Sequence, residues 1–140
     1  MKYFLVLFLS FICAQNFYIS PGFNITFNQN RDISFGSQIG VGLNYEIVHI
    51  STGIGAIYSL QNKQLRTYNF IGGGLTFLRF EYGNVKFKIN SKSNKGNRMN
   101  ILFGAPYANS ELFHSLELSS FDHKKDIKRN NWIRFPIIIK

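Results

Sequence analysis

The stretch from Ile33 to Leu60 alternates apolar and polar residues in two long runs. In the first run, Ile33 to Tyr45, alternate positions are mostly apolar and the positions between them are Gly, Ser, Gln and Asn. The second run, Val48 to Leu60, repeats this pattern almost throughout. A period of two is typical of a β-strand. The two runs therefore predict a β-hairpin with Tyr45 and Glu46 at its turn.

The predicted hairpin has one apolar face and is unusually long. With this turn, Leu43 faces Val48 and Phe35 faces Ala56. Strands of globular proteins usually have about five or six residues, whereas a strand that spans a membrane needs roughly 9–11. The first run carries no charged residue, so its small polar face suits the interior of a narrow barrel and its apolar face suits lipid. One sheet of a soluble β-sandwich is the alternative.

Alternation of the same kind predicts strands on both sides of this hairpin. A first strand runs from Phe17 to Asn28, and a polar loop leads into the hairpin so that Phe27 faces Ile33. Later strands are expected at 65–82, 85–90, 99–104, 110–121 and 132–140, with a β-bulge near residues 77–78 and a Gly-Asn turn at 83–84. The run 110–121 also fits a helix. Together the segments predict an all-β fold, an antiparallel up-and-down β-barrel of about eight strands.

The first fifteen residues have the composition of a secretory signal peptide. Lys2 gives a positive start, an apolar run follows from Tyr3 to Cys13, and Ala14 is a small residue near a cleavage point. We therefore predict a cleaved signal peptide at 1–15 and a single β-barrel domain at 16–140. The only cysteine, Cys13, lies in the signal, so the mature chain has no disulfide and no thiol chemistry.

The signal segment, the strand pattern and the alternation of polar loops with tight turns resemble the small eight-stranded outer-membrane β-barrels of Gram-negative bacteria. This resemblance implies a closed barrel in the outer membrane, with a role ranging from envelope integrity to adhesion and lipid contact. Such barrels usually end in an aromatic residue, whereas this sequence ends in Ile139-Lys140.

Charged residues within the predicted strands are expected to face the barrel lumen. A lumen of eight strands is just wide enough for its own side chains, and unpaired charge there is costly. We therefore predict an internal salt-bridge network rather than a pore. Its expected members are Arg66, Arg79, Glu81, Lys86, Lys88, Glu111, Glu117 and Arg134.

The net charge of +9 indicates an acidic partner, and the position of the basic residues suggests which one. Basic residues gather in the predicted loops at 91–98 and 122–130, on the side of the barrel that would face outward. One interpretation is that these loops contact anionic lipopolysaccharide or another acidic polysaccharide. The alternative is that they are solvated loops that keep the rim of the barrel soluble. The expected contact residues are Lys92, Lys95, Arg98, Lys124, Lys125, Lys128 and Arg129.

Catalysis has no support in the sequence. His49, His114 and His123 share no spacing typical of metal ligands, and no catalytic triad or carboxylate pair stands out. We expect a monomer in outer-membrane lipid, with no enzymatic activity, no metal, no cofactor and no nucleic-acid partner. The alternative is a secreted or periplasmic soluble β-sheet binding protein. A secreted toxin-type effector, whose basic C-terminal part would bind nucleic acid, is a third interpretation.

Overall fold

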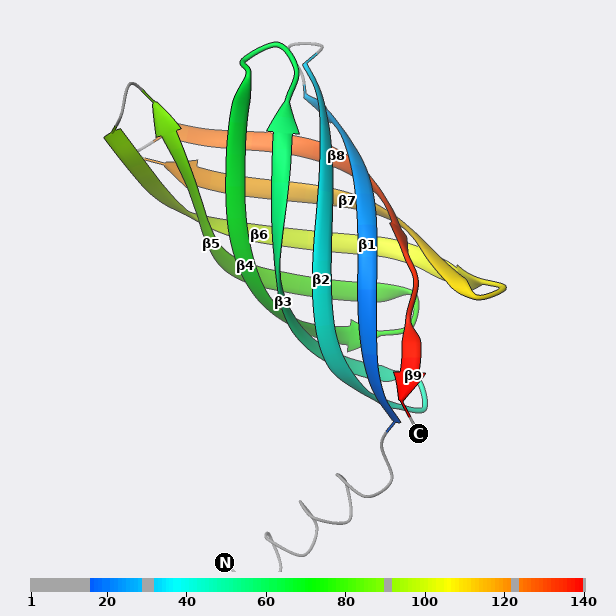
Figure 1. Cartoon of the computed structure of the whole chain (residues 1–140). Coiled ribbons are helices and arrows are strands. Elements are labelled where there is room, and N and C mark those ends of the chain that lie inside the picture. The colour runs from blue at the N-terminus through cyan, green and yellow to red at the C-terminus, as the bar shows by residue number, and fades with distance from the viewer. Residues whose placement is uncertain (1–15, 29–31, 90–91, 122–123, 140) are drawn as a thin grey trace, which may run out of the picture.

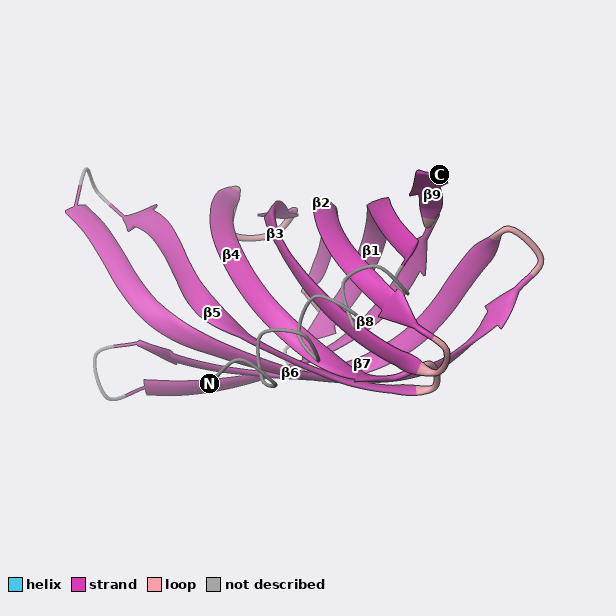
Figure 2. Ribbon diagram, turned by 90° about the horizontal axis from the view of Figure 1, so that it is seen from below, coloured by secondary structure: helices cyan, strands magenta, loops and turns pink. Residues whose placement is uncertain are grey.

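The computed structural model describes residues 16–28, 32–89, 92–121 and 124–139, apart from the side chains of Asn28, Ile89, Lys92 and Lys124. The predicted signal peptide lies outside these residues. The described chain forms nine strands and short connections (Figure 2). The strands are β1 (Asn16–Asn28), β2 (Ile33–Tyr45), β3 (Val48–Ser59), β4 (Gln64–Leu75), β5 (Leu78–Ile89), β6 (Lys92–Tyr107), β7 (Ser110–Phe121), β8 (Lys124–Arg134) and β9 (Ile137–Ile139).

The strands pair antiparallel with their sequence neighbours, and β1 closes the sheet. One edge of β1 pairs with β2, and the other pairs with β8 and then with β9 (Figure 1). The strands β8 and β9 keep one register along β1, from Gly22 opposite Arg134 to Ile19 opposite Ile137. Between them the Phe135 amide donates to the Pro21 carbonyl at 2.9 Å. The predicted all-β, up-and-down barrel of eight long strands is therefore confirmed, with β9 as an extra strand.

The two ends of the barrel differ in the connections and chain ends that lie there. The strands β1, β3, β5 and β7 all end at one end of the barrel, which we call the loop end. The three turns after β2, β4 and β6 lie at the other end, together with Asn16 and Ile139 (Figure 1). We call this second end the terminal end.

The first hairpins follow the predicted faces closely. The β1–β2 register is the expected one, with Phe27 opposite Ile33. In the β2–β3 hairpin the turn is Glu46 and Ile47, and Glu46 has a φ of 51°. The register is therefore two positions from the prediction, with Leu43 opposite Ile50. A shift of two leaves every side chain on its predicted face.

The middle of the chain differs from the prediction. The strand β4 ends at Leu75, and Thr76 and Phe77 form a turn where we expected a bulge. The expected turn at Gly83 and Asn84 lies inside β5. A Gly-Asn pair is a local turn signal, but a continuous β5 pairs with β6 from Leu78 to Ile89, and these ladder bonds outweigh a local preference.

The last third of the described chain is also strand. The run Ser110–Phe121 is a strand, not a helix. The segments 91–98 and 122–130, expected as loops, lie mostly within β6 and β8. Many basic side chains lie there, and a cluster of charge is more typical of a loop than of a strand.

Side chains alternate between the lumen and the outer surface along each strand. Polar and charged residues are the majority in the lumen, beside a smaller cluster of buried apolar and aromatic side chains. On the outer surface, Phe35, Ile54 and Phe80 are 48%, 63% and 50% exposed. This polarity is the inverse of a water-soluble fold, in which large apolar side chains face inward. Among the described residues, no helix is long and apolar enough to cross a membrane.

Candidate functional site: a charged lumen and a basic outer surface

The centre of the lumen holds three arginines and three glutamates in ion pairs. They come from β5, β6, β7 and β8, whose inward positions meet in the middle of the barrel. All six side chains are at least nine-tenths buried. They are Arg79, Glu81, Arg98, Glu111, Glu117 and Arg134.

Glu81 is the branch point of this network. Its Oε1 accepts a hydrogen bond from Arg134 Nη2 at 2.5 Å, and its Oε2 lies 3.5 Å from Arg98 Nη1. The Asn100 amide also donates to Oε2 at 3.3 Å. Gln38, with its amide oxygen turned toward Arg134, accepts from two guanidinium nitrogens at 3.0 Å. One carboxylate thus holds two guanidinium groups from different strands.

The remaining pairs extend the network in both directions. Arg98 Nε donates to Glu117 Oε2 at 2.9 Å, and Ser119 donates to the other oxygen of Glu117 at 3.0 Å. Arg79 makes two parallel bonds to Glu111, at 2.6 and 3.0 Å. Paired geometry of this kind is the strongest form of charge-assisted hydrogen bond. Each carboxylate of this network therefore has a cationic partner.

Aromatic rings separate the guanidinium groups from one another. The Arg98 guanidinium carbon lies 4.3 Å from the ring centre of Tyr68, and that of Arg79 lies 4.7 Å from the ring centre of Phe113. Arg134 lies 5.4 Å from the ring of Trp132 and 5.5 Å from that of Phe113. At these distances the ring faces attract the cations. The rings also occupy the space between the charged groups of the lumen.

A smaller cluster occupies the lumen near the loop end. Asp126 Oδ2 lies 3.4 Å from Arg66 Nη1 and 3.4 Å from Lys128 Nζ. The Arg66 guanidinium carbon lies 5.3 and 5.7 Å from the ring centres of Phe87 and Phe121. These contacts place charge and aromatic rings across the lumen at this end.

Near the terminal end, the lumen contains a cavity of about 10 Å³ between Tyr18, Gln38 and Arg134. A void of this size is only about large enough for one water molecule. The filled lumen therefore has the chemistry of a structural core, not of a wide pore.

Most of the predicted lumen residues lie where the sequence placed them. Arg66, Arg79, Glu81, Glu111, Glu117 and Arg134 face the lumen and form ion pairs. The expectation for Lys86 and Lys88 needs correction, because both are exposed on the outer face of β5. A turn at 83–84 would have placed them on the side of Arg79 and Glu81. In a continuous strand, even-numbered and odd-numbered residues lie on opposite faces. The two lysines therefore face away from Arg79 and Glu81.

Two residues predicted in the basic loops lie in the lumen instead. Arg98 is 1% exposed and Lys128 is 3% exposed. Both occupy inward positions of strands, β6 and β8, that extend further than expected. Lys95, Lys125 and Arg129 do lie on the outside, and the side chains of Lys92 and Lys124 lie outside the described part of the structure.

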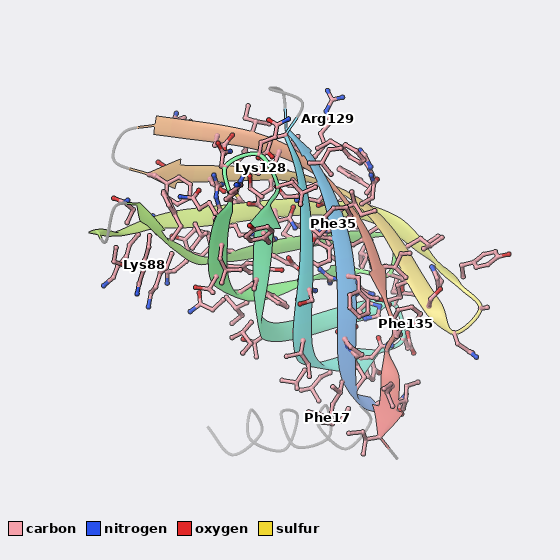
Figure 3. The ribbon with its side chains drawn as sticks, turned by 45° about the horizontal axis from the view of Figure 1, so that its top comes forward. Phe17, Phe35, Lys88, Lys128, Arg129 and Phe135 are labelled. Atoms are coloured by element: carbon pink, nitrogen blue, oxygen red, sulfur yellow. The ribbon has the colours of Figure 1, made fainter. Side chains whose placement is uncertain are left out.

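The described basic side chains on the outer surface gather toward the loop end. Figure 3 shows Lys88 and Arg129 directed away from the barrel wall, in contrast to Lys128. We call this group the outer cation cluster. It consists of Lys63, Lys86, Lys88, Lys95, Lys125 and Arg129.

Acidic side chains are distributed differently. Near the loop end, the described carboxylates of Asp32 and Asp126 face inward, and Asp32 accepts a hydrogen bond from Ser59 at 2.7 Å. Glu46, which is exposed, lies in a turn at the terminal end. The described charged side chains on the outer surface near the loop end are therefore all basic.

Several lumen residues lie in segments that were predicted as loops, although the alternation of inward and outward residues continues through them. Arg98, Asn100 and Leu102 alternate with outward Met99, Ile101 and Phe103. The same period continues through Lys128, Asn130, Trp132 and Arg134 in β8. The signal was present, but the density of charge at 91–98 and 122–130 obscured it.

Membrane barrels usually carry a girdle of aromatic residues at both strand ends, and such a girdle is only partly present here. Tyr58 and Tyr107 lie on the outer surface toward the loop end and the terminal end, and they are 41% and 70% exposed. Tyr18 and Trp132 face the lumen and are almost fully buried. Tyr82 is exposed, but in the middle of β5.

Comparison with solved structures gives the class of fold. The chain is similar to the N-terminal β-barrel domain of Pseudomonas aeruginosa OprF, with a TM-score of 0.57 and 12% identity over 87% of this chain and 97% of that one. Neisserial surface protein A aligns with a TM-score of 0.45 and 8% identity over 87% of this chain and 96% of that one. The likeness to the OprF domain, together with the closed barrel of eight long strands, confirms the predicted resemblance to small outer-membrane barrels for the fold. No protein-family model and no curated protein sequence matches the chain.

Proposed function

We propose that this protein is an outer-membrane β-barrel with a structural and surface-interaction role and no catalytic activity. The observation that carries this proposal is the inverted polarity, with an ion-pair network inside and a belt of exposed Phe, Ile, Leu and Val outside. A closed barrel satisfies every backbone hydrogen bond within the wall, as a lipid environment requires. The fold shared with the OprF domain is consistent with this role.

Cell fractionation tests the location. We expect the full chain in the outer-membrane fraction, with an electrophoretic mobility that changes on boiling because the folded barrel resists unfolding in detergent at room temperature. Recovery as a soluble monomer would contradict the proposal and would favour a periplasmic or secreted binding protein.

The same proposal assigns a partner to the outer cation cluster. We place the terminal end toward the periplasm, because its turns are short and both described chain ends lie there. The outer cation cluster then lies at the level of the phosphates of the outer leaflet. Exposed ammonium and guanidinium groups bind such phosphates through charge, in competition with salt. Lipopolysaccharide is therefore the proposed partner.

Charge reversal tests this contact. A Lys95→Glu, Lys125→Glu, Arg129→Glu triple variant should bind lipopolysaccharide more weakly than the parent chain, and the difference should shrink as ionic strength rises. The matched control is Glu46→Lys, which changes a charge at the terminal end. Equal binding by the triple variant and the parent would exclude the contact.

A further inference from the structure

The outer wall of the barrel is hollowed across β2, β3, β4 and β5. The groove has a volume of about 610 Å³. Its floor is backbone and small side chains, because Ser37 faces Ala56 and Ala56 faces Thr67 across neighbouring strands. The residues that line it are Ser37, Gln38, Ile39, Ile54, Gly55, Ala56, Thr67, Tyr68, Asn69, Asn84 and Lys86.

Large side chains border this row of small ones toward the loop end. One step along the strands, Phe35 faces Tyr58 and Tyr58 faces Leu65, and all three are exposed on the outer surface. On the opposite side, Ile39 faces Ile54. The groove is therefore a result of side-chain size and has apolar walls.

The ladder between β4 and β5 is irregular at the groove. Registered pairs run to Tyr68 opposite Val85 and resume at Ile71 opposite Tyr82. Between them the Asn84 amide donates to the Asn69 side-chain oxygen at 2.8 Å. The Asn69 side chain takes the place of a backbone acceptor in the ladder. Both Asn69 and Asn84 are exposed on the outer surface of the wall.

The groove lies at the border between the apolar belt and the basic surface. On its terminal-end side, an apolar row crosses the sheet, with Tyr82 opposite Met99 and Met99 opposite Leu118. One step toward the loop end, Asn84 faces Asn97. A further step gives Lys86, which faces Lys95. The groove thus changes from apolar to polar to cationic along its length.

Lys86 lines the cationic end of the groove, and Lys95 lies directly opposite it on the neighbouring strand. Like charges on facing positions of neighbouring strands repel and destabilise a sheet. Neither ammonium takes part in an ion pair with another described residue. Both side chains are exposed on the outer face, where an anion could bridge them. A phosphate would replace the repulsion with two attractions.

We propose that the groove binds one lipid A molecule, the acylated and phosphorylated glycolipid of the outer leaflet. One acyl chain lies along Ile39 and Ile54, and one phosphate lies between Lys86 and Lys95. Thr67 and Asn84 donate hydrogen bonds to polar groups between chain and phosphate. This inference rests on the proposed function and adds to it an acyl-binding site distinct from simple charge attraction.

The test separates the acyl contact from the phosphate contact. The folded full chain in detergent is titrated with lipid A and, separately, with fully deacylated lipopolysaccharide, and bound ligand is counted by native mass spectrometry. Ala56→Trp fills the groove and should weaken lipid A binding about tenfold, while binding of the deacylated ligand stays unchanged. Lys86→Gln should weaken both ligands, since each carries the phosphates.

Matched controls keep the result interpretable. Ala105→Trp makes the same change at an exposed outward position near the terminal end of β6, so it should leave both ligands unaffected. Every variant is first checked for the boiling-dependent mobility of the folded barrel. If Ala56→Trp does not fold, Ser37→Phe fills the groove from β2 and serves in its place.

The outcomes distinguish this inference from the proposed function. If a folded groove-filling variant binds lipid A as tightly as the parent, the acyl site is refuted, and the proposed function stands as long as the charge-reversal variant still loses binding. If the parent chain binds neither ligand, the partner in the proposed function fails as well. If phosphatidylglycerol displaces lipid A at equal concentration, the groove is not a specific site for lipid A and the proposal is refuted.

Discussion

Glu81 is a buried carboxylate that lies between two guanidinium groups. It is 2% exposed and lies within reach of Arg98 and Arg134. Moving such charges out of water costs several kcal/mol for each ion, and only close pairing compensates for it. The ion pairs therefore compensate for the cost of burying charge in the lumen and add little net stability to the barrel.

Removing the charge of Glu81 should destabilise the barrel strongly. In Glu81→Gln, Arg134 loses its carboxylate partner while it stays buried, and breaking a buried pair in this way costs about 3–5 kcal/mol. The measurement is the free energy of unfolding from urea titration of the folded chain in lipid vesicles. Glu46→Gln, at an exposed turn, is the control and should change this free energy by less than about 0.5 kcal/mol. Equal stability of the two variants would refute the network.

At the scale of the element, the face of a side chain follows from the bounds of its strand. Lys128 and Arg129 are neighbours in β8, yet Lys128 is buried in the lumen and Arg129 is exposed on the outer surface. The same alternation separates Lys86 from Glu81 in β5. Adjacent positions can therefore have unrelated roles.

This alternation predicts opposite effects for two neighbouring substitutions. Lys128→Gln removes a cation that lies 3.4 Å from Asp126, so it should lower the free energy of unfolding and leave lipopolysaccharide binding unchanged. Arg129→Gln should weaken binding at low salt and leave stability within about 0.5 kcal/mol. Both quantities are measured on both variants. The same effect from the two substitutions would contradict the assigned faces.

The continuous course of β5 depends on glycine at one point. A Cβ on Gly83 would lie 1.8 Å from the Asn69 carbonyl oxygen, so the two strands could not keep their separation. Gly83→Ala should therefore destabilise the barrel by about 1–3 kcal/mol. Gly40→Ala is the matched control, because the closest contact of a Cβ there is the end of the Phe70 ring at 3.3 Å, and the nearest backbone atom lies at 3.5 Å. Urea titration decides, and a larger loss in the Gly40 variant would show that the strands do not approach as described.

At the scale of the whole molecule, the lumen and the outer surface carry different charge. The described lumen holds as many acidic as basic side chains, when Asp32 at the loop-end mouth is included. Among the described side chains, the basic excess therefore lies outside the lumen. The described lumen is balanced in charge, and the described outer surface is basic.

A filled lumen predicts that the protein does not form an open channel. Purified barrel added to a planar lipid bilayer should give no stepwise ion conductance, because ion pairs and aromatic rings occupy the lumen centre. A general porin inserted under the same conditions serves as the positive control. Reproducible conductance steps from the parent chain would mean that the network opens in the membrane.

Much of the architecture could be predicted from local patterns. The first three strands, the β1–β2 register and the strand at 110–121 agree with the alternation of the sequence. The predictions were wrong where the bounds of a strand depend on pairing with residues far away in the sequence. The Gly83-Asn84 pair has the composition of a turn, but β5 passes through it because β6 pairs with its whole length. One misplaced turn then put Lys86 and Lys88 on the wrong face.

The sequence by itself determined the strand period, the apolar outer face and the class of fold, because side-chain alternation is a local property of an extended chain. Only the tertiary structure decided where each middle strand ends, and hence which charges are buried. Arg98 and Lys128 belong to the lumen because closure of the barrel brings β6 and β8 into full pairing with their neighbours. Closure is a long-range event, since β1 must meet β8 and β9 across the whole chain, and no local pattern encodes it.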